Sequence, residues 1–245
     1  MARSLSVARR FSLAYLGLAA LLGVAVGMFV VLVDRPSPKP PPPWSAWAPT
    51  RTARIARQVQ IATHVAAEYR LGDGKKLVDV VVRDPQKAPA IQDLALTRTL
   101  YPTQRSDIIS AVETDKAAMY ILCGAGGPPT CAINGNPSET RAAVLRREAL
   151  ELALYTFRYV DDTDSVLISF PRKDVPYVVY FTKDDLADQL HRPLRRTLAR
   201  PSGPVPRGLS ESERTTIDEL TIPRQYRAAS REEGSGASVL YLAPR

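Results

Sequence analysis

The sequence predicts an α+β protein made of an N-terminal transmembrane helix and an extracytoplasmic domain. We expect that domain to have a mainly antiparallel sheet with packed helices, ferredoxin-like in part. Three observations lead to this prediction. Residues 11–33 form an uncharged apolar run, and prolines crowd the stretch that follows it. Beyond residue 50, helical periods of hydrophobicity alternate with short apolar runs, which is typical of helices and strands sharing one core.

Residues 11–33 are interpreted as an uncleaved membrane anchor, preceded by Arg3, Arg9 and Arg10. At ~1.5 Å per residue the run reaches roughly 34 Å, enough to cross a ~30 Å hydrocarbon core. The alternative is a cleaved signal peptide, whose apolar core would span only about 7–15 residues. Since charges before a first helix usually stay inside, we expect a single-pass protein of the cell membrane. Residues 1–10 would be cytoplasmic and the C-terminal domain extracytoplasmic.

Small residues line one side of this predicted anchor, because Ala19, Gly23 and Gly27 recur every four positions. Such a face lets a second helix approach closely, so it predicts self-association into a homodimer. The alternative is chance recurrence of residues that are common in membrane helices. Residues 34–49 form the predicted linker, because the prolines within it favour an extended polyproline II spacer.

The domain expected at residues 50–200 follows from hydrophobic periods and turn residues. Thr52 is the expected N-cap of a first helix that ends before Gly72. Ser138 is the expected N-cap of a central helix that is apolar on more than one face. The remaining expected elements are strands at 77–82, 91–100, 119–123, 166–170 and 177–181, a helix from 184 interrupted at Pro193, a helix at 210–220 and a last strand at 238–242.

From residue 119 the expected order is strand, helix, strand, strand, helix, which is the order of a ferredoxin-like unit. The continuously apolar strands predict burial on both faces of the sheet. Arg147 and Glu151 are spaced to pair on an exposed side of the central helix. The C-terminal extension at 201–245 contains the apolar run 239–242, so we expect it to pack back onto the domain.

Cys123 and Cys131 are the only cysteines and flank a glycine-rich loop. Outside the cytoplasm such a close pair indicates a disulfide first. Free thiols, a catalytic thiol or a metal site are the alternatives. A metal site would need two further ligands, and His64 and His191 lie in unrelated segments. The glycine loop lacks the lysine and the spacing of a phosphate-binding P-loop.

Arg192, Arg195, Arg196 and Arg200 form a basic stretch without acids. It predicts binding to an anionic surface, either lipid headgroups or anionic wall polymers, and a solvated face is the alternative. Of the net charge of +8, +3 lies before Pro36, and the +5 left for the rest of the chain falls short of a nucleic-acid-binding signature. The acids at 161–164 could suggest calcium, yet they lack the glycine and terminal glutamate of a calcium loop. A polar turn is the favoured interpretation.

Two stretches carry a family resemblance: residues 113–124, which begin Glu113-Thr114-Asp115-Lys116, and the central helix at 145–157. Both resemble an uncharacterised family of single-pass membrane proteins of high-GC Gram-positive bacteria. The resemblance runs from the anchor to the tail and implies the same architecture. It implies no activity, cofactor or site residue.

Two classes of function fit these features. The first is a membrane-anchored extracytoplasmic interaction or scaffold module of the cell envelope, with the bilayer, envelope proteins or a second copy as partners and with no cofactor. The second is an exported cell-wall or lipid-acting hydrolase that uses carboxylates, because paired acids leave no local motif. The sequence contains no G-x-S-x-G or H-E-x-x-H motif. The first class therefore requires fewer unseen features.

Overall fold

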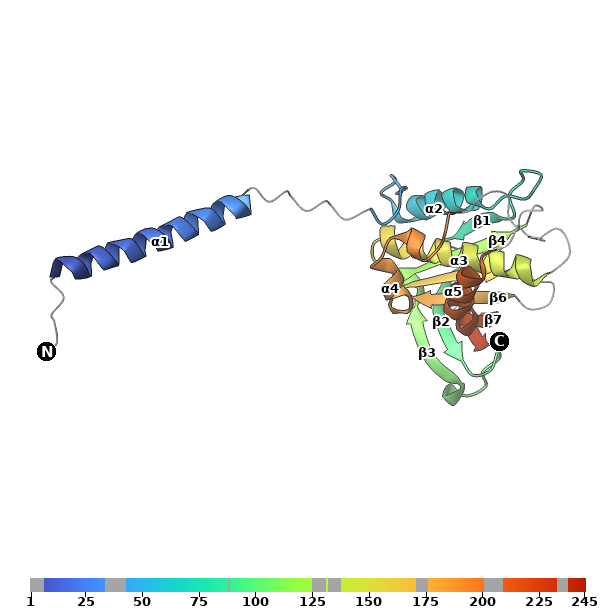
Figure 1. The fold of residues 1–245 in the computed structure, drawn as a ribbon. Helices are drawn as coiled ribbons and strands as arrows, with labels where there is room; N and C mark the ends of the chain where they lie inside the picture. The colour runs from blue at the N-terminus through green and yellow to red at the C-terminus, as the bar shows by residue number, and fades with distance from the viewer. Residues whose placement is uncertain are drawn as a thin grey trace. The chain divides into compact units, whose positions relative to one another are not determined.

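The computed structural model describes residues 7–33, 43–87, 89–124, 131, 138–170, 176–200, 209–232 and 238–245 (Figure 1), and within the first range it describes side chains only at 15–29. The chain forms two compact units, Met1–Pro42 and Pro43–Arg245. The predicted linker lies outside the described residues from 34 to 42, and so do residues 1–6 of the predicted cytoplasmic segment.

The first unit contains helix α1 (Val7–Val33). Its described large apolar side chains are between 56% and 71% exposed. Across the described residues, no helix is both long and apolar enough to cross a membrane. The predicted transmembrane span at 11–33 is therefore not supported.

The second unit is an α+β domain with one mixed, eight-stranded sheet. Its elements include α2 (Arg54–Glu68), β1 (Asp79–Arg83), β2 (Ile91–Thr97), β3 (Ile108–Glu113), β4 (Ala117–Cys123), α3 (Glu139–Tyr159), β5 (Ser165–Phe170), β6 (Tyr177–Thr182), α4 (Ala187–Leu190), α5 (Glu211–Thr221), β7 (Gln225–Glu232) and β8 (Ser238–Pro244). Helices α2, α3 and α5 lie on one face of this sheet (Figure 1).

The strand order is β1-β4-β5-β6-β7-β8-β2-β3. The β4–β5 and β2–β8 pairs are parallel, and the other neighbours are antiparallel. A ferredoxin-like unit would place another strand between the two parallel strands of its split βαβ motif. Here β4 and β5 are direct hydrogen-bonded neighbours across α3. The ferredoxin-like prediction is therefore wrong, and α3 is the crossover of an ordinary βαβ unit.

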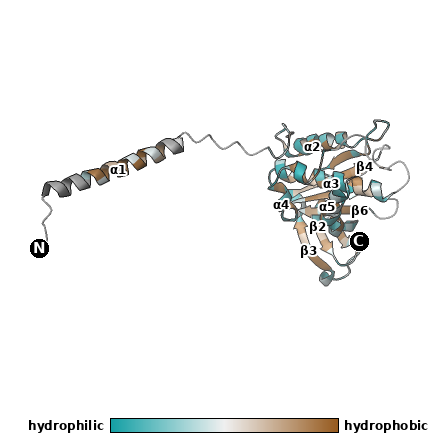
Figure 2. Ribbon diagram, viewed as in Figure 1, coloured by the Kyte–Doolittle hydropathy of each residue, from teal (hydrophilic) through white to brown (hydrophobic). Residues whose placement is uncertain are grey.

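The central strands are buried on both faces, as their continuously apolar sequences predict. In β4, Tyr120 and Leu122 belong to the core beneath the helices, whereas Met119 belongs to a second cluster. The same alternation separates Val179 from Val178 in β6, because successive side chains of a strand point to opposite faces. Figure 2 shows strands that are largely brown, that is, hydrophobic, and helices that are teal in part.

Among the described residues, the second cluster is built from strands alone. Leu94 of β2 and Leu242 of β8 join Met119 and Val178 there. The connection from β1 to β2 is compact, because Ile91 N donates to Pro85 O at 2.8 Å. The sheet must therefore curl, since β1 and β2 lie near opposite ends of the strand order.

Most helix boundaries follow local sequence signals. Ser138 caps α3 by accepting a hydrogen bond from Arg141 N, and Ser210 caps α5 in the same way from Glu213 N. The predicted interruption at Pro193 is confirmed, since α4 ends at Leu190 and a short 3-10 turn, Leu194–Arg196, follows. Thr52 is not the first cap. Helix α2 begins after Ala53, which makes no side-chain cap.

Candidate functional site

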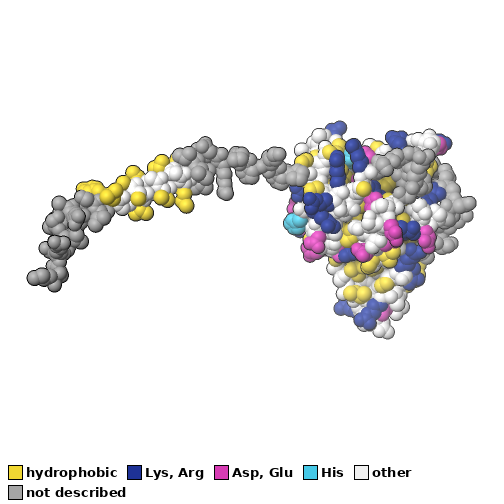
Figure 3. Space-filling model, in the orientation of Figure 1, with side chains coloured by type: hydrophobic (Ala, Val, Ile, Leu, Met, Phe, Trp, Pro, Cys, Tyr) yellow, Lys and Arg dark blue, Asp and Glu magenta, His cyan; other side chains and the backbone are white. Residues whose placement is uncertain are grey.

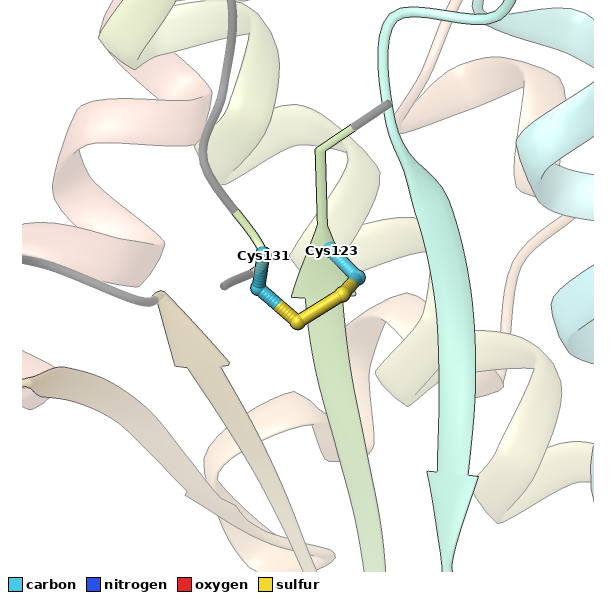
Figure 4. Close-up of a disulfide and its surroundings, with 2 residues drawn as sticks. All are labelled: Cys123 and Cys131. Atoms are coloured by element: carbon cyan, nitrogen blue, oxygen red, sulfur yellow. A yellow bond between two sulfur atoms is a disulfide. The ribbon is translucent and has the colours of Figure 1, made fainter. Parts of the chain in front are cut away.

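The predicted disulfide is present between Cys123, at the end of β4, and Cys131 (Figure 4). Their Cα atoms are 4.2 Å apart, and Gly124 N donates to Cys131 O. Closing so short a loop contributes ~2.5 kcal/mol in the chain-entropy model. Neither cysteine is free, so the thiol and metal interpretations of this pair are wrong. The glycine loop between them lies mostly outside the described residues.

The predicted self-association face lies on α1. A Cβ atom added at Gly23 or Gly27 would meet no described atom within 4 Å, and Ala19 is exposed. Within the first unit, no described residue therefore packs against this face. Self-association through it stays a prediction.

The predicted basic stretch divides into buried and exposed positions. Leu194 and Leu198 are 6% and 2% exposed and belong to the main core. Arg195, Arg196 and Arg200 are exposed, whereas Arg192 is half-buried. The four arginines do not form one uniform surface, and Arg192 is the exception.

Helix α3 carries a buried network of charged residues. Its burial was not predicted from the sequence. Arg147 is 3% and Glu151 7% exposed, and Arg147 Nη1 lies 3.2 Å from Glu151 Oε2. Arg147 Nε also donates to Glu213 Oε1 on α5 at 2.9 Å, and Tyr69 donates its hydroxyl proton to Glu151 at 2.6 Å. The predicted Arg147–Glu151 pairing is confirmed, but its exposed location is wrong. It joins α3 to α5 and to the end of α2.

Glu148 lies beside this network, and its carboxylate lacks hydrogen bonds from the described residues. It is fully buried, and neither carboxylate oxygen has a hydrogen-bond partner among the described residues. Burial first, and then the nearby Glu151 carboxylate, raise the pKa of Glu148 well above its usual value. Such a group is most stable in its neutral form. Packed in the helix core, it offers no access to a substrate.

A cavity of about 140 Å³ lies against the second face of the sheet. Its lining is mainly apolar and includes Met119, Leu167 and Val178, and Arg83 is the one charged residue among the described residues that line it. Arg83 Nη2 donates to Pro89 O at 3.0 Å. The described lining contains no carboxylate. Paired-acid hydrolysis would need two of them.

The acids at 161–164 form a turn between α3 and β5. Asp161 pairs with Arg57 at 2.8 Å, Asp162 has a positive φ of 56°, and Asp164 N donates to Lys116 O. Within the described part of the chain, no three metal-ligating side chains gather into a metal site. The ion pair, the turn conformation and the backbone hydrogen bond fit the polar-turn interpretation.

The most unusual surface feature is β3, which forms one edge of the sheet. All six of its residues are exposed, and Ile109 is 62% exposed. Figure 2 shows β3 as a brown ribbon, and in Figure 3 hydrophobic side chains reach the surface over that part of the domain. We call Ile108–Glu113 the β3 edge. Among the described residues no strand pairs with its outer side, and no charged residue occurs from Ile108 to Val112.

No strand was predicted at this position. The signal was nevertheless present, because Ile108, Ile109 and Val112 are β-branched residues that favour strands. What the local sequence could not provide is the position of this strand at the edge. That position depends on the parallel pairing of β2 with β8, which lies far along the chain.

Comparisons with known proteins give no relative: no family model, no curated protein and no solved structure matches this chain. The family resemblance of residues 113–124 and 145–157 stays a prediction.

Proposed function

We propose that this chain is a membrane-anchored extracytoplasmic interaction or scaffold module of the cell envelope, without catalytic activity of its own. The observation that carries this proposal is the β3 edge. Natural proteins usually protect sheet edges with charges, prolines or covering segments, because an open edge pairs readily with another chain. Ile108, Ile109 and Val112 instead remain exposed there. An edge of this kind suits strand addition by a partner.

Two further features support anchoring outside the cytoplasm. The large apolar side chains described on α1 have no cover from the described chain, and a bilayer would supply it. The disulfide between Cys123 and Cys131 suits an oxidising compartment. The uncharged run at 11–33 is thus proposed as the anchor, with residues 1–10 cytoplasmic.

The partner is proposed to be an extended segment of another protein. A second copy of β3 could pair antiparallel around Ser110, which would set Ile108 opposite Val112. That register also sets Asp107 opposite Glu113, and like charges opposite one another are destabilising. A heterologous strand with apolar residues flanked by Lys or Arg avoids this repulsion and complements both acids.

The hydrolase alternative gains no support. The cavity has no acid in its described lining. The close acids Glu148 and Glu151 are buried in the helix core.

Site-specific crosslinking in intact cells tests the proposed function. A photoreactive amino acid is placed at Ser110 of the full chain, an affinity tag follows Arg245, and mass spectrometry maps the crosslinked peptide. The matched control carries the photoreactive group at Ile222, which is 51% exposed outside the edge. We expect a discrete envelope protein joined through an extended apolar segment with basic flanks, at position 110 and not at 222.

Three outcomes would contradict the proposal. Capture of a second copy would replace the heterologous partner with self-pairing. Equal capture at both positions would mean that the edge is not the binding surface. An absence of any crosslink at position 110 would remove the interaction role of β3.

A further inference from the structure

The segment that carries the predicted basic stretch, residues 192–200, is hydrogen-bonded to Trp44 near the start of the second unit. We call it the basic segment. Leu194 N donates to Trp44 O at 2.8 Å, and Trp44 Nε1 donates to Gln189 O at 3.4 Å. Leu194 and Leu198 are buried in the main core. The segment therefore cannot swing away from Trp44, which stands at the start of the second unit.

Three arginines of this segment have no ion-pair partner among the described residues. Arg195, Arg196 and Arg200 are exposed and form no ion pair with a described residue. By contrast, ion pairs engage Arg57, Arg146, Arg147, Arg214 and Arg224. No acid occurs from residue 190 to residue 210, so the local charge is uncompensated along the chain.

Acidic residues lie near these arginines, and not every arginine of the segment is exposed. Asp184 and Asp188 precede it and are exposed. Figure 3 shows dark blue side chains at the end of the domain near α4, with magenta side chains beside them. Arg192 is half-buried and its Nε is buried without a described partner. We therefore define the basic surface as Arg195, Arg196 and Arg200 only.

We propose that this basic surface binds anionic lipid headgroups of the membrane that holds α1, so that the domain lies against the bilayer. The inference rests on the proposed anchoring. Residues 34–42 reach at most about 30 Å when fully extended, so an anchored chain keeps Trp44 within about that distance of the end of the anchor, and the segment that is hydrogen-bonded to Trp44 stays near the bilayer with it. Each arginine near an anionic leaflet favours the bound state about fivefold, or on the order of 100-fold for three.

The two tryptophans provide an intrinsic reporter. Trp44 and Trp47 are the only tryptophans in the chain, and Trp44 contacts the basic segment directly. The full chain is reconstituted into phosphatidylcholine vesicles with or without phosphatidylglycerol, each containing a dansyl-labelled lipid as energy acceptor. We expect stronger transfer from tryptophan to dansyl in the anionic vesicles. Added salt should reduce it, because exposed charges are screened.

Two variants with equal changes of charge identify the surface. The triple variant Arg195→Gln, Arg196→Gln, Arg200→Gln should lower transfer to the level of neutral vesicles. The control triple variant changes Arg98, Arg105 and Arg231, which are also exposed, to Gln and should keep strong transfer. Circular dichroism of each variant checks that the fold is intact.

The failures of the two proposals are distinguishable. A chain that does not float with vesicles overturns the anchoring itself. A chain that floats but gives equal transfer in both vesicle types overturns only the lipid-binding inference. An equal loss in both triple variants would also overturn it, because binding would then reflect net charge and not this surface.

Discussion

Helices α1 and α3 are opposites in where they place their polar and apolar groups. In α1 the run from residue 11 to 33 has no charge, and its described large apolar side chains are 56–71% exposed. Helix α3 buries nearly every residue from Ala143 to Phe157. Its buried residues include Arg147, Glu148 and Glu151. From composition alone, one would expect the apolar side chains of α1 to be buried and the charged side chains of α3 to be exposed.

The difference shows that burial depends on neighbours as well as on composition. Helix α3 lies between the sheet, α2 and α5, so its charged positions are enclosed whatever their polarity. Arg147 is satisfied there by Glu151, Glu213 and the Tyr69 hydroxyl. Within its own unit, helix α1 has no such neighbours among the described residues. An apolar helix of this kind needs a partner or a bilayer, whereas α3 already has its cover.

The largest effect is expected from Arg147→Ala. The change leaves Glu151 and Glu213 without their buried cation, and breaking a buried charge pair typically costs 3–5 kcal/mol. The free energy of unfolding should fall by about that amount. It is measured by urea denaturation with tryptophan fluorescence. Arg214→Ala is the control, because Arg214 is 40% exposed and pairs with the largely solvated Glu139. The control should lose ~1 kcal/mol or less. Equal losses would mean that the buried network contributes no more than a surface pair.

Helix α3 also shows how far the sequence can predict this fold. Its position, its Ser138 cap and the Arg147–Glu151 pairing follow from spacing along the helix. Whether the Arg147–Glu151 pair is exposed or buried does not follow from the spacing, because a spacing of four residues is the same on a face that meets solvent as on a face that packs against α5. Arg147 and Glu213 are separated by 66 residues, and no local pattern brings them together.

Similar limits apply to the sheet and to the candidate site. The continuous apolar runs predict the two-sided burial of β4, β5 and β6, and the cysteine spacing predicts the disulfide. Strand β7 was not predicted, because its sequence is polar and exposed along much of its length. The β3 edge could have been recognised as a strand from Ile108, Ile109 and Val112. Its uncovered state depends on strand order, which is a property of the whole chain.

The next largest effect is expected on the opposite helix, from Leu22→Arg in α1. If α1 is the proposed anchor, an arginine near the centre of the hydrocarbon core costs ~2.5–3.5 kcal/mol. The variant should then lose membrane retention, measured as the fraction that floats with membranes after an alkaline wash. Val59→Arg is the control, because Val59 is an apolar residue 47% exposed on α2, and it should leave retention unchanged. Unchanged retention of Leu22→Arg would contradict a spanning α1.

The smallest effect is a pH dependence that comes from Glu148 in α3. Burial and the neighbouring Glu151 raise the pKa of Glu148 in the folded state. When the pH exceeds the pKa that Glu148 has in the unfolded chain, the folded chain therefore keeps a proton that the unfolded chain has lost. The free energy of unfolding must then fall as pH rises above about 4.5, by up to ~1.4 kcal/mol per pH unit. Glu148→Gln cannot ionise and lacks this loss. Its urea midpoint, compared with that of the parent chain at about pH 5 and about pH 7, should become relatively higher as pH rises. The exposed Glu219→Gln on α5 should follow the parent chain. Parallel losses in all three proteins would show that α3 encloses Glu148 less tightly than its contacts indicate.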